Sequence, residues 1–228
     1  MPVDHSPLVI KTTIRIADIE PPIWRHILLP RELNFAQLHE VIQAAFGWSD
    51  SHLHQFVVGG LVVGAPEFDE DQLGERKILE ATEIALRDLD FYHFPHPRIL
   101  YEYDFGDSWL HWIEFDPQMP SEDGVKYPIC VDGARHSPPE DVGGPRGYAD
   151  FLKAWCDPTH PEHRAMKTWA GRSFDPEAFD IAKTNKAIAA ALRRCRGDYR
   201  QARETTLRRS PQLTPAVHAN CRCTPDDP

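Results

Sequence analysis

Two short blocks of the sequence place histidines and acids beside aromatic side chains. They are Asp50-Ser-His-Leu-His-Gln-Phe56 and Tyr101-Glu-Tyr-Asp-Phe-Gly-Asp-Ser-Trp-Leu-His111. Side chains two residues apart on a strand project from the same face, so His52 and His54 would present two imidazoles together. Such a pair commonly binds Zn²⁺ or Fe²⁺, with a carboxylate or a third histidine completing the site. The predicted ligands are His52, His54, Asp104, Asp107 and His111.

The same residues also fit a purely structural interpretation. His52 and His54 can be hydrogen-bonded histidines on an aromatic-rich sheet surface, and Asp107 can simply form a turn. A His-x-His pair without a fixed third ligand leaves the cofactor open between none and Zn²⁺ or Fe²⁺. Glu102 and Asp104 would share a strand face, as paired catalytic carboxylates do, but alternating acids are ordinary on an exposed strand. No motif in the sequence therefore fixes a reaction.

Aromatic residues in and around these blocks predict either a binding surface or a core. They could stack on bases or line a peptide-binding cleft, but packing in the core is the interpretation that we favour. The segment Pro138–Pro145 is expected to bring two acids near the candidate site. The candidates for a binding surface are Trp24, Trp48, Tyr101, Tyr103, Trp109, Glu140 and Asp141.

Charge is unevenly distributed along the 228 residues, whose formal net charge is −10. Residues 193–228 contain eight Arg and four Asp or Glu, a net of +4, so residues 1–192 carry −14. An acidic body repels phosphate backbones and does not favour nucleic acid. The Arg-rich tail is expected to be a solvated, disordered segment, with a DNA-binding arm as the alternative.

Composition and cysteine usage predict a cytoplasmic protein. Five cysteines are an odd number, and their scattered spacing does not fit a disulfide framework. No apolar run reaches the length of a membrane span, and the first residues lack the pattern of a secretory signal. We therefore expect no contact with a membrane, and a protein or peptide as the partner if there is one.

Apolar periodicity predicts the elements that position the candidate site. Alternation predicts strands, and Asn34, Gln37 and Gly47 predict a capped helix between the second and third of them. A turn at 106–108 would join two strands in a hairpin. Residues 117–147 are too poor in periodicity for a regular element. The strands are predicted at 8–16, 23–29, 52–58, 61–63, 99–105 and 109–115, and helices at 35–46, 148–155, 161–169 and from 175 onward.

These elements predict the α+β class, with strands gathered early and helices late. We expect a ββαβ, β-grasp-like N-terminal part, an added β-hairpin, and a C-terminal helical part packed on the sheet. Residues 1–192 would form a single domain, and 193–228 a separate, disordered tail.

Several motifs in order along the chain resemble one family. They are Ile23-Trp-Arg25, Leu38–Trp48, Asp50–Phe56, Tyr101–Trp109, Pro138–Pro145, Gly147-Tyr148 and Phe174–Phe179. Over about residues 8–192 the chain resembles the Ri-plasmid ORF-three-like family, some of whose members are labelled TnpR-like passenger proteins of insertion elements. The resemblance implies no established activity. A serine resolvase needs its Ser beside clustered Arg residues. In this chain, the Arg residues before Arg193 are scattered.

The function that we expect is a soluble binding or accessory module found with plasmids or insertion elements, rather than an enzyme. A metal-dependent hydrolase or nuclease that uses the His/Asp residues is the first alternative. A DNA-binding accessory protein that acts through the basic tail is the second.

Overall fold

The computed structural model describes residues 7–64, 78–89, 96–171 and 174–194, and these form one mixed sheet with four α-helices. The sheet has eight strands in the order β5-β4-β3-β6-β7-β1-β2-β8, and every neighbouring pair is antiparallel except β4 and β5. The strands are β1 Leu8–Ile16, β2 Trp24–Pro30, β3 His54–Val58, β4 Leu61–Gly64, β5 Ile78–Glu80, β6 Arg98–Tyr103, β7 Trp109–Pro120 and β8 Ile129–Ala134. The helices are α1 Phe35–Phe46, α2 Gly144–Cys156, α3 His163–Trp169 and α4 Ile181–Arg194, with a short 3₁₀ turn at Leu86–Asp88.

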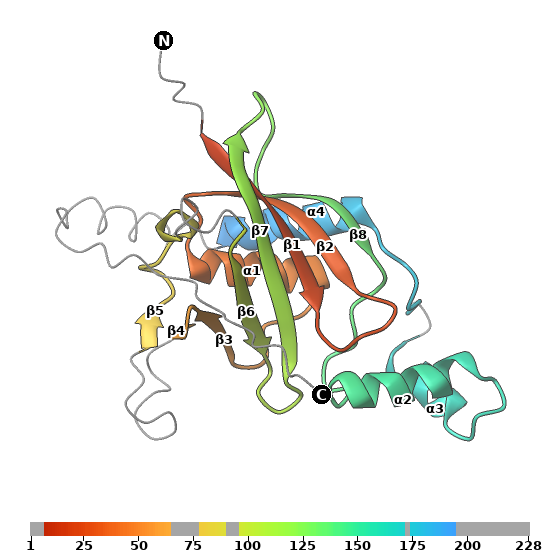
Figure 1. Cartoon of the computed structure of the whole chain (residues 1–228). Coiled ribbons are helices and arrows are strands. Elements are labelled where there is room, and N and C mark those ends of the chain that lie inside the picture. Colours follow the sequence, from red (N-terminus) through yellow and green to blue (C-terminus); the bar gives the residue numbers. More distant parts are fainter. Residues whose placement is uncertain (1–6, 65–77, 90–95, 172–173, 195–228) are drawn as a thin grey trace, which may run out of the picture.

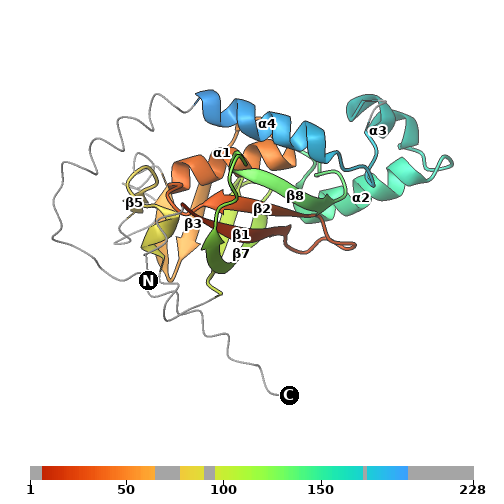
Figure 2. The same cartoon turned by 90° about the horizontal axis from the view of Figure 1, so that it is seen from above.

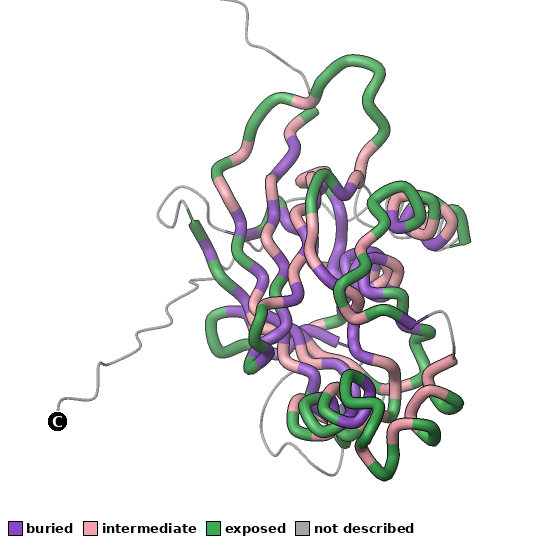
Figure 3. The backbone as a smooth tube through the Cα atoms, turned by 90° about the vertical axis from the view of Figure 1, so that its right-hand side faces the viewer, coloured by how far each residue is buried: buried purple, intermediate pink, exposed green. Residues whose placement is uncertain are grey.

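Helix α1 lies against one face of the sheet, and α4 lies outside α1 (Figures 1 and 2). Helices α2 and α3 lie together beyond the end of the sheet. Buried positions gather where the sheet meets α1, while turns and outer helix faces are exposed (Figure 3). The α+β class is therefore confirmed, with the core between one sheet face and the helices.

The sequence of α1 accounts for its position and length. The Asn34 side chain accepts from the Gln37 backbone N–H, and the Gln37 side chain accepts from the Asn34 N–H, which completes a capping box. Gly47 ends the helix in the left-handed conformation, at φ 73°. Phe35, Leu38 and Ile42 are buried on the stripe that faces the sheet. The predicted helix is confirmed at both ends.

Arg25 ties α1 to the sheet from inside the core. All five of its N–H groups donate, and its guanidinium lies between the rings of Phe46 and Phe179. Because burial disfavours the charged form, the pKa of Arg25 is lowered to about 10. The acceptors are the carbonyls of Trp24, Ala45, Ala134 and Arg135 and the hydroxyl of Ser137.

The prediction that residues 117–147 lack a regular element is wrong. Strand β7 continues to Pro120, β8 occupies Ile129–Ala134, and α2 begins at Gly144. Strand β8 lies at the sheet edge and buries only Cys130, so it has no alternating pattern to detect. Asn185 of α4 pairs with both the N–H and the C=O of Cys130, at 2.7 and 2.8 Å.

Three further expectations differ from the structure or go beyond it. The sheet order places β1 between β7 and β2, and it does not confirm a β-grasp-like arrangement. The last helix begins at Ile181 rather than near Asp175, and it runs to Arg194, past the predicted domain boundary at 192. The tail beyond Arg194 lies outside the described residues. Among the described helices, none is long and apolar enough to cross a membrane.

Candidate functional site

Three segments meet at one end of the sheet: residues 48–53 before β3, the β6–β7 turn at 104–108, and the loop at 138–144. The Asp104 N–H donates to Leu53 O at 2.8 Å, and the Gly143 N–H donates to the Asp107 carboxylate at 3.0 Å. Within the described residues, four of the six non-glycine residues with positive φ lie in these segments. Such backbone conformations cost free energy and tend to occur at functional sites. The four residues are Asp50, Asp104, Ser108 and Asp141.

One residue from each segment contributes to what we call the outer cluster: His52, Asp104 and Asp141. The Nε2 atom of His52 lies 3.2 Å from an Asp141 oxygen and 3.7 Å from an Asp104 oxygen. The side chains of His52 and Asp104 are 27% and 11% exposed, and that of Asp141 is 73% exposed. The cluster therefore joins a half-buried base to one buried and one accessible carboxylate.

One nitrogen of the outer cluster has no hydrogen-bond partner among the described residues. One oxygen of Asp104 accepts from the N–H groups of Gly106 and Asp107, and the other oxygen faces His52. The buried Nε2 of His52 makes no hydrogen bond to any described residue. A buried polar atom without a partner costs about 1–3 kcal/mol, unless a water or an ion satisfies it. One ligand atom from each residue lies within 4.8 Å of the others, a spacing that suits a metal ion.

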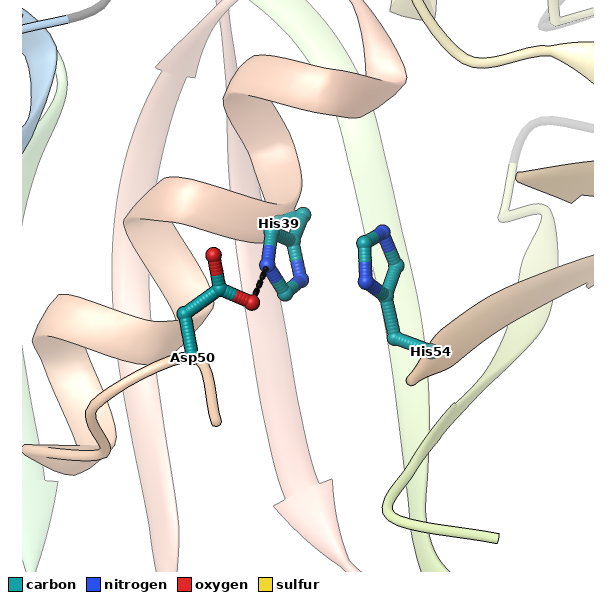
Figure 4. Close-up of side chains that lie close together, drawn as sticks. All are labelled: His39, Asp50 and His54. Carbon is teal, nitrogen blue, oxygen red and sulfur yellow. Dashed lines mark hydrogen bonds and ion pairs between the residues drawn. The ribbon is translucent and has the colours of Figure 1, made fainter. Parts of the chain in front are cut away.

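His39, Asp50 and His54 form a second group, the inner cluster, between α1 and β3 (Figure 4). The Asp50 carboxylate contacts His39 Nε2 at 2.8 Å, and His39 Nδ1 lies 2.8 Å from the Tyr101 hydroxyl. The rings of His39 and His54 stack with their centroids 3.4 Å apart and their planes 7° apart. The hydrogen bond from His39 lowers the pKa of Asp50, against the opposing effect of burial.

The hydrogen bonds of the inner cluster assign the tautomer of His39. Gln43 accepts from the Asp50 N–H through its carbonyl oxygen, so its amide nitrogen donates to the Tyr101 hydroxyl at 3.1 Å. Within this network, the phenol proton finds its acceptor at His39 Nδ1, and Nε2–H then donates to Asp50. Both nitrogens of His39 are used.

The inner cluster is a poor metal site, because both nitrogens of His39 already have hydrogen-bond partners. The geometry of the two rings gives a second reason. The lone pairs of an imidazole lie in the plane of its ring, and the two rings here are nearly parallel. Their lone pairs run side by side and do not converge on one ion. Burial and the neighbouring His39 lower the pKa of His54 to about 3, so His54 is neutral at ordinary pH. The inner cluster therefore acts as a packed support, in which His39 and Asp50 are hydrogen-bonded and His54 stacks on His39.

The five predicted ligands are thus distributed over different environments. His52 and Asp104 meet in the outer cluster, and His54 belongs to the inner one. The Asp107 carboxylate holds the Gly143 N–H. His111 is fully buried against Phe46 and Trp48, and burial lowers its pKa to about 3.

The predicted binding-surface residues divide in a similar way. Trp48, Tyr101, Tyr103 and Trp109 are buried, so their rings pack in the core rather than offering a stacking platform. Trp24 is half-buried and lies against His26. Glu140 and Asp141 lie at the three-segment site, and Asp141 belongs to the outer cluster itself.

His39 is the residue of the site that the sequence patterns did not predict. It lies four residues after Phe35 and three before Ile42, on the apolar stripe of α1. A polar residue on a buried stripe needs a partner, and this is the signal that points to it. Strand spacing would place Asp50 on one face with His52 and His54, but β3 begins only at His54.

Fold and site together define an α+β protein with a histidine–carboxylate cluster at one end of an antiparallel sheet. The family described as plasmid pRiA4b ORF-3-like protein matches residues 9–183, and the chain belongs to this family. It is 34% identical over 183 residues to the uncharacterized protein y4hQ of Sinorhizobium fredii (strain NBRC 101917 / NGR234), covering 79% of this chain and 90% of that protein.

A solved structure shares the fold. The crystal structure of MM3350, a protein of unknown function from Methanosarcina mazei Go1, superposes with a TM-score of 0.69 at 34% identity. The match covers 78% of this chain and 97% of that one. Both similar proteins are named without an activity, so the comparisons indicate no specific function.

Proposed function

We propose that this protein is a metal-dependent binding module, in which the outer cluster holds a divalent cation that contacts a protein or peptide partner. The observation that carries the proposal is the buried Nε2 of His52, which lies between the carboxylates of Asp104 and Asp141 without a hydrogen bond to a described residue. An ion at this point would satisfy the nitrogen and neutralise both acids. Three protein ligands would leave coordination positions open for a partner.

The donor set narrows the class of ion. One imidazole and two carboxylates are compatible with Zn²⁺ and suit Fe²⁺ or Mn²⁺ as well. The cation would supply a Lewis-acidic centre to which a carboxylate or imidazole of the partner can bind. In this chain, Asp104 would serve through the oxygen that faces His52, because Gly106 and Asp107 hold the other one.

Apolar side chains beside the ligands support a protein or peptide as the partner. Leu53 follows His52 and is 41% exposed, and Phe105 follows Asp104 and is 45% exposed. The two segments are joined by the hydrogen bond from Asp104 N–H to Leu53 O. An exposed aromatic and an aliphatic side chain beside an ion suit a peptide that carries an acid next to an apolar residue.

Calorimetric titration of the purified protein with Zn²⁺, Fe²⁺ and Mn²⁺ tests the proposal. His52→Ala is expected to lower the affinity at least about 100-fold, since it removes the nitrogen ligand. His54→Phe is the matched control from the inner cluster, and it should retain binding. The proposal fails if the wild-type chain binds none of these ions, or if His52→Ala binds as tightly as wild type.

A metal-dependent hydrolase or nuclease is the second candidate. It is favoured by the accessible Asp141 carboxylate, which could receive a proton from a metal-bound water. The test is turnover of phosphodiester and ester substrates by the ion-loaded protein, with loss of turnover in Asp141→Asn. Turnover that persists in this variant would show that Asp141 does not receive the proton.

Three wider expectations remain part of the proposal. A cytoplasmic location is supported by the odd, scattered cysteines, and a role with plasmids only by the name of the family. DNA binding by the Arg-rich tail would weaken steeply with salt and disappear on truncation after Leu192. Absence of binding at low salt would remove this third candidate.

A further inference from the structure

We infer that Glu140 is the positioning residue that assembles the outer cluster, an inference that rests on the proposed function. Glu140 precedes Asp141, and its carboxylate is bound by the segment that carries His52. The ligand histidine and the ligand aspartate are thus fixed to each other through a residue that is not itself a ligand. The donors to Glu140 are Ser49 N–H at 3.1 Å, the Tyr103 hydroxyl at 2.7 Å, and the hydroxyls of Ser49 and Ser51.

These bonds fix the backbone that leads to His52. The N–H of Ser49 donates to Glu140, that of Asp50 to the Gln43 side chain, and that of Ser51 to the Tyr103 hydroxyl. Each of three successive N–H groups therefore has a side-chain acceptor from another element. Tyr103 links the two sets, since its hydroxyl accepts from Ser51 N–H and donates to Glu140.

The other side of Asp141 is fixed as well. Gly143 N–H donates to Asp107, and a Cβ on Gly144 would come within 2.3 Å of Asp107 O. Asp141 thus lies between an anchor on the His52 segment and an anchor on the turn that carries Asp104. These two anchors bring the three ligand-bearing segments together before any ion arrives, which lowers the cost of ordering them on binding.

Glu140 is suited to this role rather than to proton transfer. Burial by itself raises its pKa, but the hydrogen bonds from Ser49 and Tyr103 outweigh that effect and hold the pKa below its usual value. Its oxygens are already occupied by four donors. A carboxylate bonded in this way is a stable acceptor at ordinary pH.

The test compares Glu140→Ala, Glu140→Gln and the charge-matched control Glu122→Ala, measuring Mn²⁺ affinity and amide hydrogen exchange. Glu140→Ala is expected to lower the affinity by about 10- to 100-fold and to speed exchange at Ser49 and Ser51. Glu140→Gln should recover most of the affinity, because its carbonyl can still accept from Ser49 N–H and Tyr103. The control should match wild type.

The outcomes separate this inference from the proposed function. If the wild-type chain binds Mn²⁺ and Glu140→Ala binds within about two-fold of it, Glu140 does not position the ligands. If the wild-type chain binds no ion, the proposed function fails. The positioning role of Glu140 is then tested by nuclear Overhauser signals between the His52 ring and Asp141. Signals that disappear only in Glu140→Ala support the positioning role, and signals that persist in this variant overturn it.

Discussion

The inner and outer clusters start from the same short segment and use the same residue types, yet their hydrogen bonding differs. In the inner cluster, both nitrogens of His39 are hydrogen-bonded, and a stacked neighbour covers its ring. In the outer cluster, the Nε2 of His52 is buried without a described hydrogen-bond partner and lies between two acids. The difference teaches that, in the function that we propose, the hydrogen bonding of His39 and His52 rather than their residue type separates a support from a binding site.

The largest effect is expected on the free energy of unfolding at acidic pH. Unfolded histidines bind a proton below about pH 6.5, whereas His54 and His111 in the folded chain remain neutral down to about pH 3. The unfolded state therefore binds more protons in this window, and the free energy of unfolding falls as pH falls from 6.5 toward 3. Each histidine contributes at most about 1.4 kcal/mol per pH unit.

His54→Phe and His111→Phe should each flatten this dependence, as measured by urea unfolding at pH 7.5 and pH 4.5. At pH 7.5 both histidines are neutral in either state, so that measurement gives the packing cost of each substitution alone. An unchanged difference between the two pH values in either variant would mean that this histidine is not the source of the acid sensitivity.

Two tyrosines offer a matched comparison of the clusters. Tyr101→Phe leaves His39 Nδ1 and the Gln43 amide without their partner inside the core, and it should lower the free energy of unfolding by about 3 kcal/mol. Tyr103→Phe also removes a phenol hydroxyl, whose partners are Glu140 and Ser51. Water can reach these two partners more easily than those of Tyr101. The cost of Tyr103→Phe should be about 1 kcal/mol, and equal costs would contradict the distinction between the clusters.

Gly144 tests the packing of the outer site. Gly144→Ala forces a Cβ against Asp107 O at a left-handed φ of 68°. Gly124→Ala meets the same left-handed preference, at φ 79°, but no described atom lies within 4 Å of its new Cβ. Thermal or chemical unfolding should show Gly144→Ala to be about 2 kcal/mol more costly than Gly124→Ala. Similar costs would mean that the 138–144 loop can move away freely.

The smallest effect on stability is expected at Asp141. Its side chain is 73% exposed, so Asp141→Asn should change the free energy of unfolding by less than about 0.5 kcal/mol. The same variant should lose most of its affinity for the ion. A large loss of stability in the ion-free protein would make Asp141 a structural residue and remove the contrast with the inner cluster.

Local patterns predicted much of the fold but only part of the site. The capped helix α1 and the β6–β7 hairpin follow from caps, periodicity and turn residues that act over a few positions. The meeting of His52 with Asp104 was a hypothesis that depended on the two sequence blocks lying side by side, and β3 does pair with β6. His52 is separated from His54 because β3 begins only at His54, whose ring stacks on His39 of another element. No local pattern contains that information.

Contacts between residues far apart in the chain decide both the burial of His111 and the position of Asp141. Which face of β7 meets α1 is decided by the whole sheet, and this places His111 against Phe46 and Trp48. Asp141 lies beside His52 at the point where Glu140, the preceding residue, accepts from a segment some ninety positions earlier in the chain. Strand β8 was not predicted because it is held by backbone pairing with β2 and by Asn185, and its sequence has no alternating apolar pattern.

The two bonds between Asn185 and Cys130 have a consequence for how this molecule meets others. An open sheet edge invites another chain to add a strand, which is a route to aggregation. At Cys130, the amide side chain from α4 occupies the groups that such a strand would need. The opposite edge strand, β5, has only three residues. Pairing with a further strand is thus blocked at Cys130 and limited by the short length of β5.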